Sequence, residues 1–218
     1  MIKKFKELFL KLIETLIRNI SGKLGVIIRR EYYSRRFAEC GENVRIYEGV
    51  IINGAEHMHL GSNIAIDKYC ILMAGKVEVA NEDEQIQYKK NENYKFKIGE
   101  FHLGSNVRIA PYSLIQAHGG VSIGDNFMAS SGCKIYSFSN DVSQCNAETF
   151  SNKTIHHILS PIHICDNVWL GLNAIVLSGT IHKNSFIAPN SVVLKSIEEN
   201  SFAVGNPAKK IKNRLKES

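Results

Sequence analysis

The amino-acid sequence predicts an all-β solenoid, a parallel β-helix, preceded by an amphipathic helix and followed by a short C-terminal helix. Three observations predict it: a helical apolar period confined to residues 1–20, a six-residue repeat over most of residues 41–205, and a Gly-Asn-Pro turn before the lysine-rich residues that follow. The chain therefore divides into a basic helical segment (1–40), a solenoid body (41–205) and a C-terminal helix or tail (206–218).

An amphipathic helix is predicted over residues 1–20. Apolar residues recur there at steps of three and four, and charged residues lie off that stripe. Residues 1–36 carry ten Lys or Arg against three Glu, a net charge of +7, whereas the whole chain carries +6. Two interpretations stay open. The stripe packs on the body or a neighbouring subunit, or the apolar face and basic rim attach residues 1–36 to an anionic membrane surface.

From about residue 43 a six-residue period replaces the helical one. Segments such as Leu60-Gly-Ser-Asn-Ile64, Ile123-Gly-Asp-Asn-Phe127 and Ile164-Cys-Asp-Asn-Val168 begin with an aliphatic residue that can point into a narrow interior. The polar residues inside each hexad suit turns. Each hexad thus supplies one short strand and one turn, and three hexads close a triangular coil that stacks on the next. A β-sandwich, with turns about every 8–12 residues, does not fit this spacing.

Two stretches, residues 79–97 and 137–160, interrupt the repeat. Neither contains a hexad, so both are expected to loop out from the coils. Long loops on a rigid scaffold commonly carry substrate contacts. The alternative is that either loop is a disordered insertion.

Composition and charge argue against several classes of protein. The positive charge lies at one end, and no aromatic nucleic-acid platform is present, so no nucleic-acid partner is expected. The five cysteines are odd in number and lack C-x-x-C spacing, which predicts reduced thiols in a cytoplasmic protein. No export signal or membrane-spanning segment is predicted. No metal site is expected, because His118 lacks the histidine partner that a zinc site of this fold would need on the next coil.

Two segments near the C-terminus, Ile164-Cys-Asp-Asn-Val-Trp-Leu-Gly-Leu-Asn-Ala-Ile-Val-Leu-Ser-Gly179 and Val204-Gly-Asn-Pro-Ala-Lys-Lys-Ile211, resemble the hexapeptide-repeat acyltransferases. These include the maltose, galactoside and xenobiotic acetyltransferases, and Cys40-Gly-Glu-Asn-Val-Arg-Ile46 is similar to the polysaccharide O-acetyltransferases of bacteria. The resemblance covers about residues 40–215. It implies a left-handed coil, a homotrimer, and acetyl-CoA or another acyl-CoA bound as co-substrate between adjacent subunits.

The same resemblance implies where the co-substrate lies. The pantetheine arm would follow Trp169, Gly171, Leu172, Ala188, Pro189, Leu194 and Lys195, and the nucleotide end would lie near Pro207, Lys209 and Lys212. Lysine suits phosphate binding because its ammonium is a mobile point charge.

The catalytic histidine of the family is replaced in this chain. Its position corresponds to Asn140 or, on the polysaccharide-type pattern, to Asp141. Three explanations stay open. Asn140 is a substitution that removes the base; Asp141 is a weaker base that needs burial to raise its pKa from about 3.9; or a nearby histidine takes over, since imidazole suits proton transfer near neutral pH. The candidates are His156 and His157 on the same loop and His118 one coil earlier.

The activity implied by the resemblance is transfer of an acyl group, acetyl first among them, to a hydroxyl or amine of a sugar or surface-glycan precursor. Such work would take place in the cytoplasm or at the inner face of the membrane. The alternative is a catalytically impaired hexapeptide-repeat protein, a base-less variant or scaffold, that still binds acyl-CoA.

Overall fold

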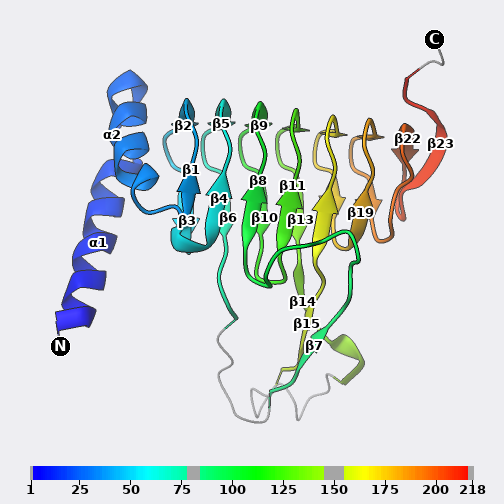
Figure 1. Ribbon diagram of the computed structural model, residues 1–218, viewed down its shortest axis with the longest axis horizontal. Helices are drawn as coiled ribbons and strands as arrows, with labels where there is room; N and C mark the ends of the chain where they lie inside the picture. The colour runs from blue at the N-terminus through cyan, green and yellow to red at the C-terminus, as the bar shows by residue number, and fades with distance from the viewer. Residues whose placement is uncertain (1, 78–83, 145–154, 216–218) are drawn as a thin grey trace.

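The computed structural model describes residues 2–77, 84–144 and 155–215. Two helices, α1 (Ile2–Arg18) and α2 (Gly22–Ser34), precede a row of short strands that wind repeatedly through three sheets (Figure 1). The stacked coils form an elongated body with the helices at one end and the C-terminus at the other.

Three sheets, named A, B and C in the order in which each coil passes through them, form the faces of the body. Sheet A contains β1 (Glu39–Cys40), β4 (Met58–Leu60), β8 (Phe101–Leu103), β11 (Val121–Ile123), β16 (Ile162–Ile164) and β19 (Gly179–Ile181). Sheet B contains β2 (Val44–Ile46), β5 (Ile64–Ile66), β9 (Val107–Ile109), β12 (Met128–Ala129), β17 (Trp169–Leu170), β20 (Phe186–Ile187), β22 (Ser201–Val204) and β23 (Lys209–Asn213). Sheet C contains β3 (Ile51–Asn53), β6 (Ile71–Met73), β10 (Leu114–Gln116), β13 (Lys134–Tyr136), β18 (Ile175–Val176) and β21 (Val192–Val193).

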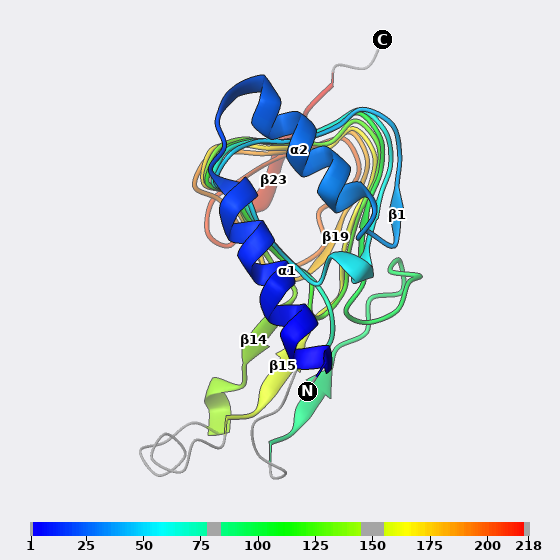
Figure 2. The ribbon, with the colours of Figure 1, turned by 90° about the vertical axis from the view of Figure 1, so that its left-hand side faces the viewer.

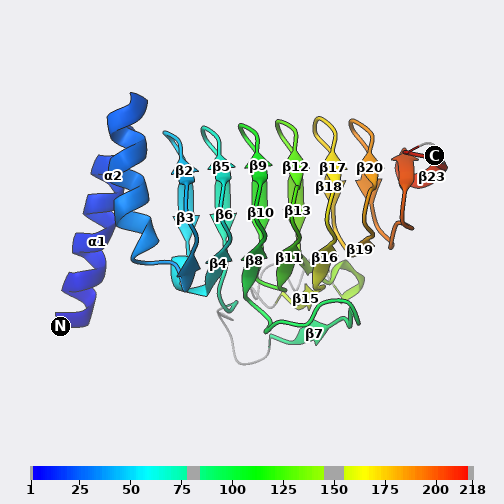
Figure 3. The ribbon, with the colours of Figure 1, turned by 45° about the horizontal axis from the view of Figure 1, so that its top comes forward.

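Within these sheets each strand pairs in parallel with the strand of the next coil, so that the strands of a sheet stand in a row along the body (Figure 3). Strands β22 and β23 are the exception and are antiparallel. The aliphatic residue of each hexad points inward. Ile66, Ile109 and Leu170 of sheet B, for example, are fully buried. Burying a side chain of this size contributes about 1.5–3 kcal/mol relative to leaving it exposed. The predicted parallel β-helix is therefore confirmed.

An asparagine ladder closes the corner between sheets A and B. Asn63, Asn106 and Asn126 adopt left-handed backbone conformations with φ of 58°, 59° and 54°, which asparagine tolerates better than most residues. Asn63 Nδ2 donates to Asn106 Oδ1 over 3.2 Å, and Asn106 Nδ2 donates to Asn126 Oδ1 over 3.2 Å. Asn43, Asn167 and Asn184 extend the same ladder. The polar pair in each hexad is thus explained by the turn it builds.

Helices α1 and α2 lie across the N-terminal end of the coils (Figure 2). Arg29 of α2 ties them to the body: its Nη1 donates to the carbonyl oxygens of Ile17 (2.9 Å) and Ile20 (2.8 Å), and its Nε donates to that of Ile46 (2.9 Å). Its side chain satisfies carbonyls left without partners at the end of α1. Arg29 is 1% exposed, and this burial lowers the pKa of its guanidinium. It is a structural cation, not part of the basic surface.

The two interruptions of the repeat form one arm. Strand β15 (His157–Leu159) pairs in parallel with β7 (Ile86–Tyr88) and antiparallel with β14 (Phe138–Asn140). This three-stranded sheet projects below the body (Figure 1). Short β-forming runs in the two stretches pair with one another, a contact that the repeat pattern does not indicate. Residues 78–83 and 145–154 of the predicted loops lie outside the described residues.

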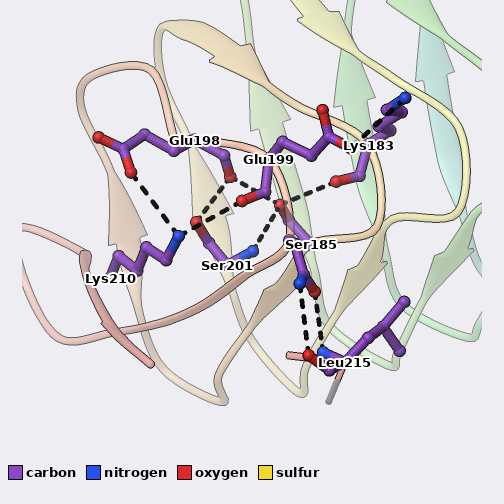
Figure 4. A network of polar contacts seen from close by, with 8 residues as sticks. Lys183, Ser185, Glu198, Glu199, Ser201, Lys210 and Leu215 are labelled. Atoms are coloured by element: carbon purple, nitrogen blue, oxygen red, sulfur yellow. Dashed lines mark hydrogen bonds and ion pairs between the residues drawn. The ribbon is translucent and has the colours of Figure 1, made fainter. Parts of the chain in front are cut away.

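The C-terminus is a strand, and the predicted C-terminal helix is wrong. Strand β23 pairs antiparallel with β22 and covers the edge of sheet B. Figure 4 shows polar contacts of this end, including Ser201 Oγ donating to the Glu198 carbonyl over 2.6 Å and Lys210 Nζ at 3.7 Å from the Glu198 carboxylate. A helix of so few residues is marginal on its own, whereas the strand satisfies the backbone of an otherwise open edge.

Candidate active site

Asn140 and His157 lie opposite each other on the paired strands of the arm. His157 Nδ1 lies 3.2 Å from Asn140 Oδ1, and His157 Nε2 lies 3.6 Å from a carboxylate oxygen of Glu84. Because both ring nitrogens have partners, His157 is poorly placed to take a proton from a substrate. The contact with His157 instead orients the Asn140 side chain.

The other loop candidates also have structural partners. The carboxylate of Asp141 accepts hydrogen bonds from the backbone N (3.0 Å) and Oγ (2.6 Å) of Ser143, at the start of the short 3-10 helix Val142–Gln144. His156 Nδ1 accepts a hydrogen bond from the backbone N of Gln85 over 3.0 Å. Neither residue is oriented as a free base by these contacts.

His118 lies where sheet C returns to sheet A, beside the arm. Its Nδ1 lies 3.0 Å from the carbonyl oxygen of Gly75. Because a carbonyl oxygen only accepts, Nδ1 is the donor in this contact, and in the neutral imidazole the lone pair is then on Nε2, which is the tautomer that a general base needs. Phe138 contacts both histidines, with ring centroids 6.1 Å from His118 and 5.1 Å from His157. The structure therefore favours His118 among the candidates.

The residues that are expected to contact the pantetheine chain of the co-substrate lie at two opposite edges of sheet C. Five of them lie at the edge where sheet B meets sheet C, or on strand β17 of sheet B just before it: Trp169, Gly171, Leu172, Ala188 and Pro189. A Cβ on Gly171 would lie 2.7 Å from the backbone N of Pro189, so glycine lets the next coil approach. Trp169 is 42% exposed, and its Nε1 donates to Ser130 Oγ over 2.9 Å.

Leu194 and Lys195 follow β21 and lie at the opposite edge of sheet C, the edge that also carries His118 and the arm. The Leu194 side chain is exposed, like that of Leu172 on the first edge. One chain thus presents two half-sites separated by the width of a sheet.

The residues expected near the nucleotide end lie on the C-terminal strand and its approach. Pro207 precedes β23, while Lys209 and Lys212 lie on it with exposed side chains. Lys212 Nζ lies 4.8 Å from the ring centroid of Phe202. Neither lysine forms an ion pair within the described part of the chain, so both ammonium groups are available to an anion.

Three potential metal ligands come together on sheet A. Ligand atoms of His59, Glu100 and His102 lie within 4.8 Å of one another, and no other such group occurs in residues 2–77, 84–144 and 155–215. The rings of His59 and His102 are stacked, with centroids 4.2 Å apart and planes at 7°. Stacked imidazoles direct their lone pairs in parallel, not toward one point. We therefore assign this cluster a packing role.

Burial on sheet A makes the fold sensitive to acid. It is the largest cause that lowers the pKa of His102 and of His163 below the ordinary value. An unfolded histidine takes up a proton near pH 6.5, whereas these two resist protonation while folded. The contribution of these two histidines to stability is therefore fully present above about pH 7 and is lost progressively as the pH drops through 6.5. His163→Gln is expected to reduce this loss, measured as the urea midpoint at pH 7.5 and 5.5; an unchanged difference would contradict it.

No protein-family model matches the chain. The dTDP-4-amino-4,6-dideoxy-D-glucose acyltransferase of Escherichia coli is 31% identical over 186 residues, which cover 83% of this chain and 84% of that protein.

Two solved structures share the fold. A variant of AntD, an N-acyltransferase from Bacillus cereus in complex with dTDP-4-amino-4,6-dideoxyglucose and coenzyme A, has a TM-score of 0.67 at 21% identity over 86% of this chain and 90% of that one. A maltose O-acetyltransferase from Clostridium difficile 630 has a TM-score of 0.59 at 22% identity over 95% of this chain and 86% of that one. The likeness confirms the left-handed form of the coil.

Proposed function

The chain belongs to the hexapeptide-repeat acyltransferases, and we propose that it transfers an acyl group, acetyl first among them, from coenzyme A to the amino group of a nucleotide-linked amino sugar. Acyltransferase activity, an acyl-CoA co-substrate and a sugar acceptor follow from the family. The amine and the nucleotide are the finer proposal. One feature carries the amine: on the maltose-type pattern, the resemblance to the family puts the carboxamide of Asn140 at the position of the catalytic base.

An amine and a hydroxyl place different demands on that position. A hydroxyl has to lose its proton as the new bond forms, so its base has to contact it. An amine with a pKa near 8 is partly unprotonated at neutral pH and attacks with its own lone pair. Asn140 Oδ1 is suited to accept a hydrogen bond from such an amine, and it cannot serve as a base. This difference favours amide over ester formation.

The reaction needs one proton acceptor. The acceptor nitrogen attacks the thioester carbonyl, the C–N bond forms, the C–S bond breaks and the coenzyme A thiolate leaves. The nitrogen then gives its extra proton to His118 Nε2, whose lone pair is left free by the Nδ1 contact with Gly75. The products are an amide and free coenzyme A.

The experiment is a rate comparison between paired acceptors. With acetyl-CoA, release of the coenzyme A thiol is expected with dTDP-4-amino-4,6-dideoxyglucose, and at least a hundredfold more slowly with the matching dTDP sugar that carries a 4-hydroxyl. Equal rates would contradict the preference for an amine. If no thiol is released with either acceptor, the proposed acceptor class is contradicted.

The divided half-sites support a homotrimer as the active form. The outer face of sheet C, between the two edges, carries half-buried apolar residues on most of its strands, among them Ile71, Leu114 and Ile175. A second copy packed there would bring its Leu172 edge toward the His118 edge of the first. Mixing inactive His118→Ala and inactive Leu172→Glu chains, unfolded and refolded together, is expected to restore part of the activity. No restoration would contradict a shared site.

The exposed face of the helices supports peripheral membrane attachment. Leu8, Phe9, Leu12 and Leu16 of α1 are each more than half exposed. Within the described residues, neither helix is long and apolar enough to cross a bilayer. Together with the basic residues of 1–36, this face suits the anionic inner surface of a membrane. Co-flotation with anionic vesicles, but not with neutral ones, is expected, and Leu12→Glu should abolish it; co-flotation of that variant equal to the parent's would contradict it.

A further inference from the structure

Two tyrosines occupy backbone positions that favour other residues. At the corner between sheets B and C, one residue per coil takes a left-handed conformation, and four of these positions hold Gly49, Gly132, Asn173 and Asn190. The two remaining coils place Tyr69 (φ 59°) and Tyr112 (φ 62°) there. Glycine and asparagine adopt this conformation readily, whereas a bulky side chain does so against steric resistance. Backbone strain of this kind is found at functional sites.

The rings form an exposed stack. Their centroids are 5.4 Å apart and their planes are inclined by 8°. Tyr69 is 48% exposed and Tyr112 is 67% exposed, so neither ring is held by the core. Neither ring enters the core, so core packing does not account for a tyrosine at these strained positions.

One face of the Tyr112 ring is left open by a glycine. Side chains at this corner lean over the preceding coil: the Tyr69 ring reaches within 2.2 Å of where a Cβ on Gly49 would lie, and Asn173 Oδ1 within 2.1 Å of where one on Gly132 would lie. The residue that would lean over Tyr112 in the same way is Gly132, which has no side chain. Two strand spacings, about 9.5 Å, separate the Tyr112 coil from the Asn173 coil. One planar ring fits between them.

We propose that Tyr112, backed by Tyr69, is the stacking platform for the base of the nucleotide-linked acceptor. This inference rests on the proposed function. Every nucleobase has a flat face that stacks on an aromatic side chain, and Tyr112 presents such a face.

Two neighbours favour a nucleotide as the occupant. Lys134, whose Nζ donates to the carbonyl of Gly132 over 3.1 Å, has no ion-pair partner in the described ranges and places a positive charge beside the open ring. That charge suits a phosphate. Leu172, of the expected acyl-CoA groove, lies on the same edge two coils further along. The acceptor and the co-substrate would thus bind next to each other along one edge of the body.

The test uses the asparagine that this corner already accepts. Tyr112→Asn is expected to leave the melting temperature unchanged or higher, because the new residue fits a left-handed backbone. It should weaken the affinity for dTDP, measured by calorimetry without turnover, by about tenfold or more. The KM for the nucleotide-sugar acceptor should rise by the same factor, while the KM for acetyl-CoA stays unchanged.

Two controls separate the ring from other causes. Tyr112→Phe keeps the flat face and should keep the affinity for dTDP. Tyr88→Asn removes an exposed tyrosine from the arm and should leave the affinity unchanged.

The possible outcomes are distinct. Unchanged dTDP affinity in Tyr112→Asn, a raised KM for acetyl-CoA instead of the acceptor, or dissociation of the assembly would each overturn the platform. If the parent chain turns over the amino sugar but Tyr112→Asn behaves like it, only the platform fails. If the parent chain neither binds dTDP nor turns over the amino sugar, the proposed acceptor fails with it.

Discussion

His118→Ala is expected to lower kcat about 10²–10⁴-fold while leaving the KM of both substrates nearly unchanged. The substitution removes the one predicted base whose Nε2 lone pair is left free by its other ring contact. Binding of acyl-CoA should persist, because the expected groove residues on the same edge, Leu194 and Lys195, lie three coils further along the body. Steady-state rates of thiol release, with calorimetric binding of acetyl-CoA alongside, measure both quantities.

The matched control is a histidine outside the site. His163→Ala alters sheet A, where His163 contacts Ser122 over 2.7 Å, and should leave kcat unchanged. His157→Ala should lower kcat by less than tenfold, since it removes only a contact that orients Asn140. If His118→Ala stays within threefold of the parent and His157→Ala abolishes turnover, the base has been assigned to the wrong histidine.

Arg29→Met is expected to lower the free energy of unfolding by about 3 kcal/mol or more. Hydrogen bonds from a charged group to carbonyl oxygens are the stronger class, and Arg29 makes them to the end of α1 and to the first coil at once. Methionine fills part of the volume and leaves those buried carbonyls without donors. For a chain of this size such a loss lowers the melting temperature by ~6–12 °C. Thermal unfolding followed by circular dichroism measures it.

Arg30 provides the neighbouring control. It is exposed and forms no ion pair in the part of the chain that the structure describes, so Arg30→Met should leave the melting temperature within about 2 °C of the parent. Limited proteolysis should also release the helices more readily from the Arg29 variant. Equal losses in both variants would show that Arg29 acts through general charge and not through its buried contacts.

The repeat was predictable because its physics is local. An inward aliphatic residue such as Ile66 and a turn residue such as Asn63 recur in each coil, so one short pattern predicts strand, corner and core together. The corner tyrosines were visible in the same way, since Tyr69 and Tyr112 align with Asn173 and Asn190. Their exposure and mutual stacking required the structure.

The arm, the end of the chain and the base depended on contacts between distant segments. Strand β7 pairs with β15, about 70 residues later, and no repeat relates the two. Strand β23 forms because β22 offers an edge, which overrides any weak helical preference. The sequence left His118 as one candidate of several, because the contact of its Nδ1 with the Gly75 carbonyl, 43 residues away in the sequence, follows no repeat.

The product of a single reaction tests most directly whether the chain forms an amide on a nucleotide-linked amino sugar. The chain is incubated with isotopically labelled acetyl-CoA and dTDP-4-amino-4,6-dideoxyglucose, and the acceptor is analysed by mass spectrometry before and after mild alkali. We expect one labelled acetyl group per acceptor, equimolar free coenzyme A, and an amide that survives the alkali. An unlabelled acceptor, or a label that alkali removes as an ester does, would contradict it.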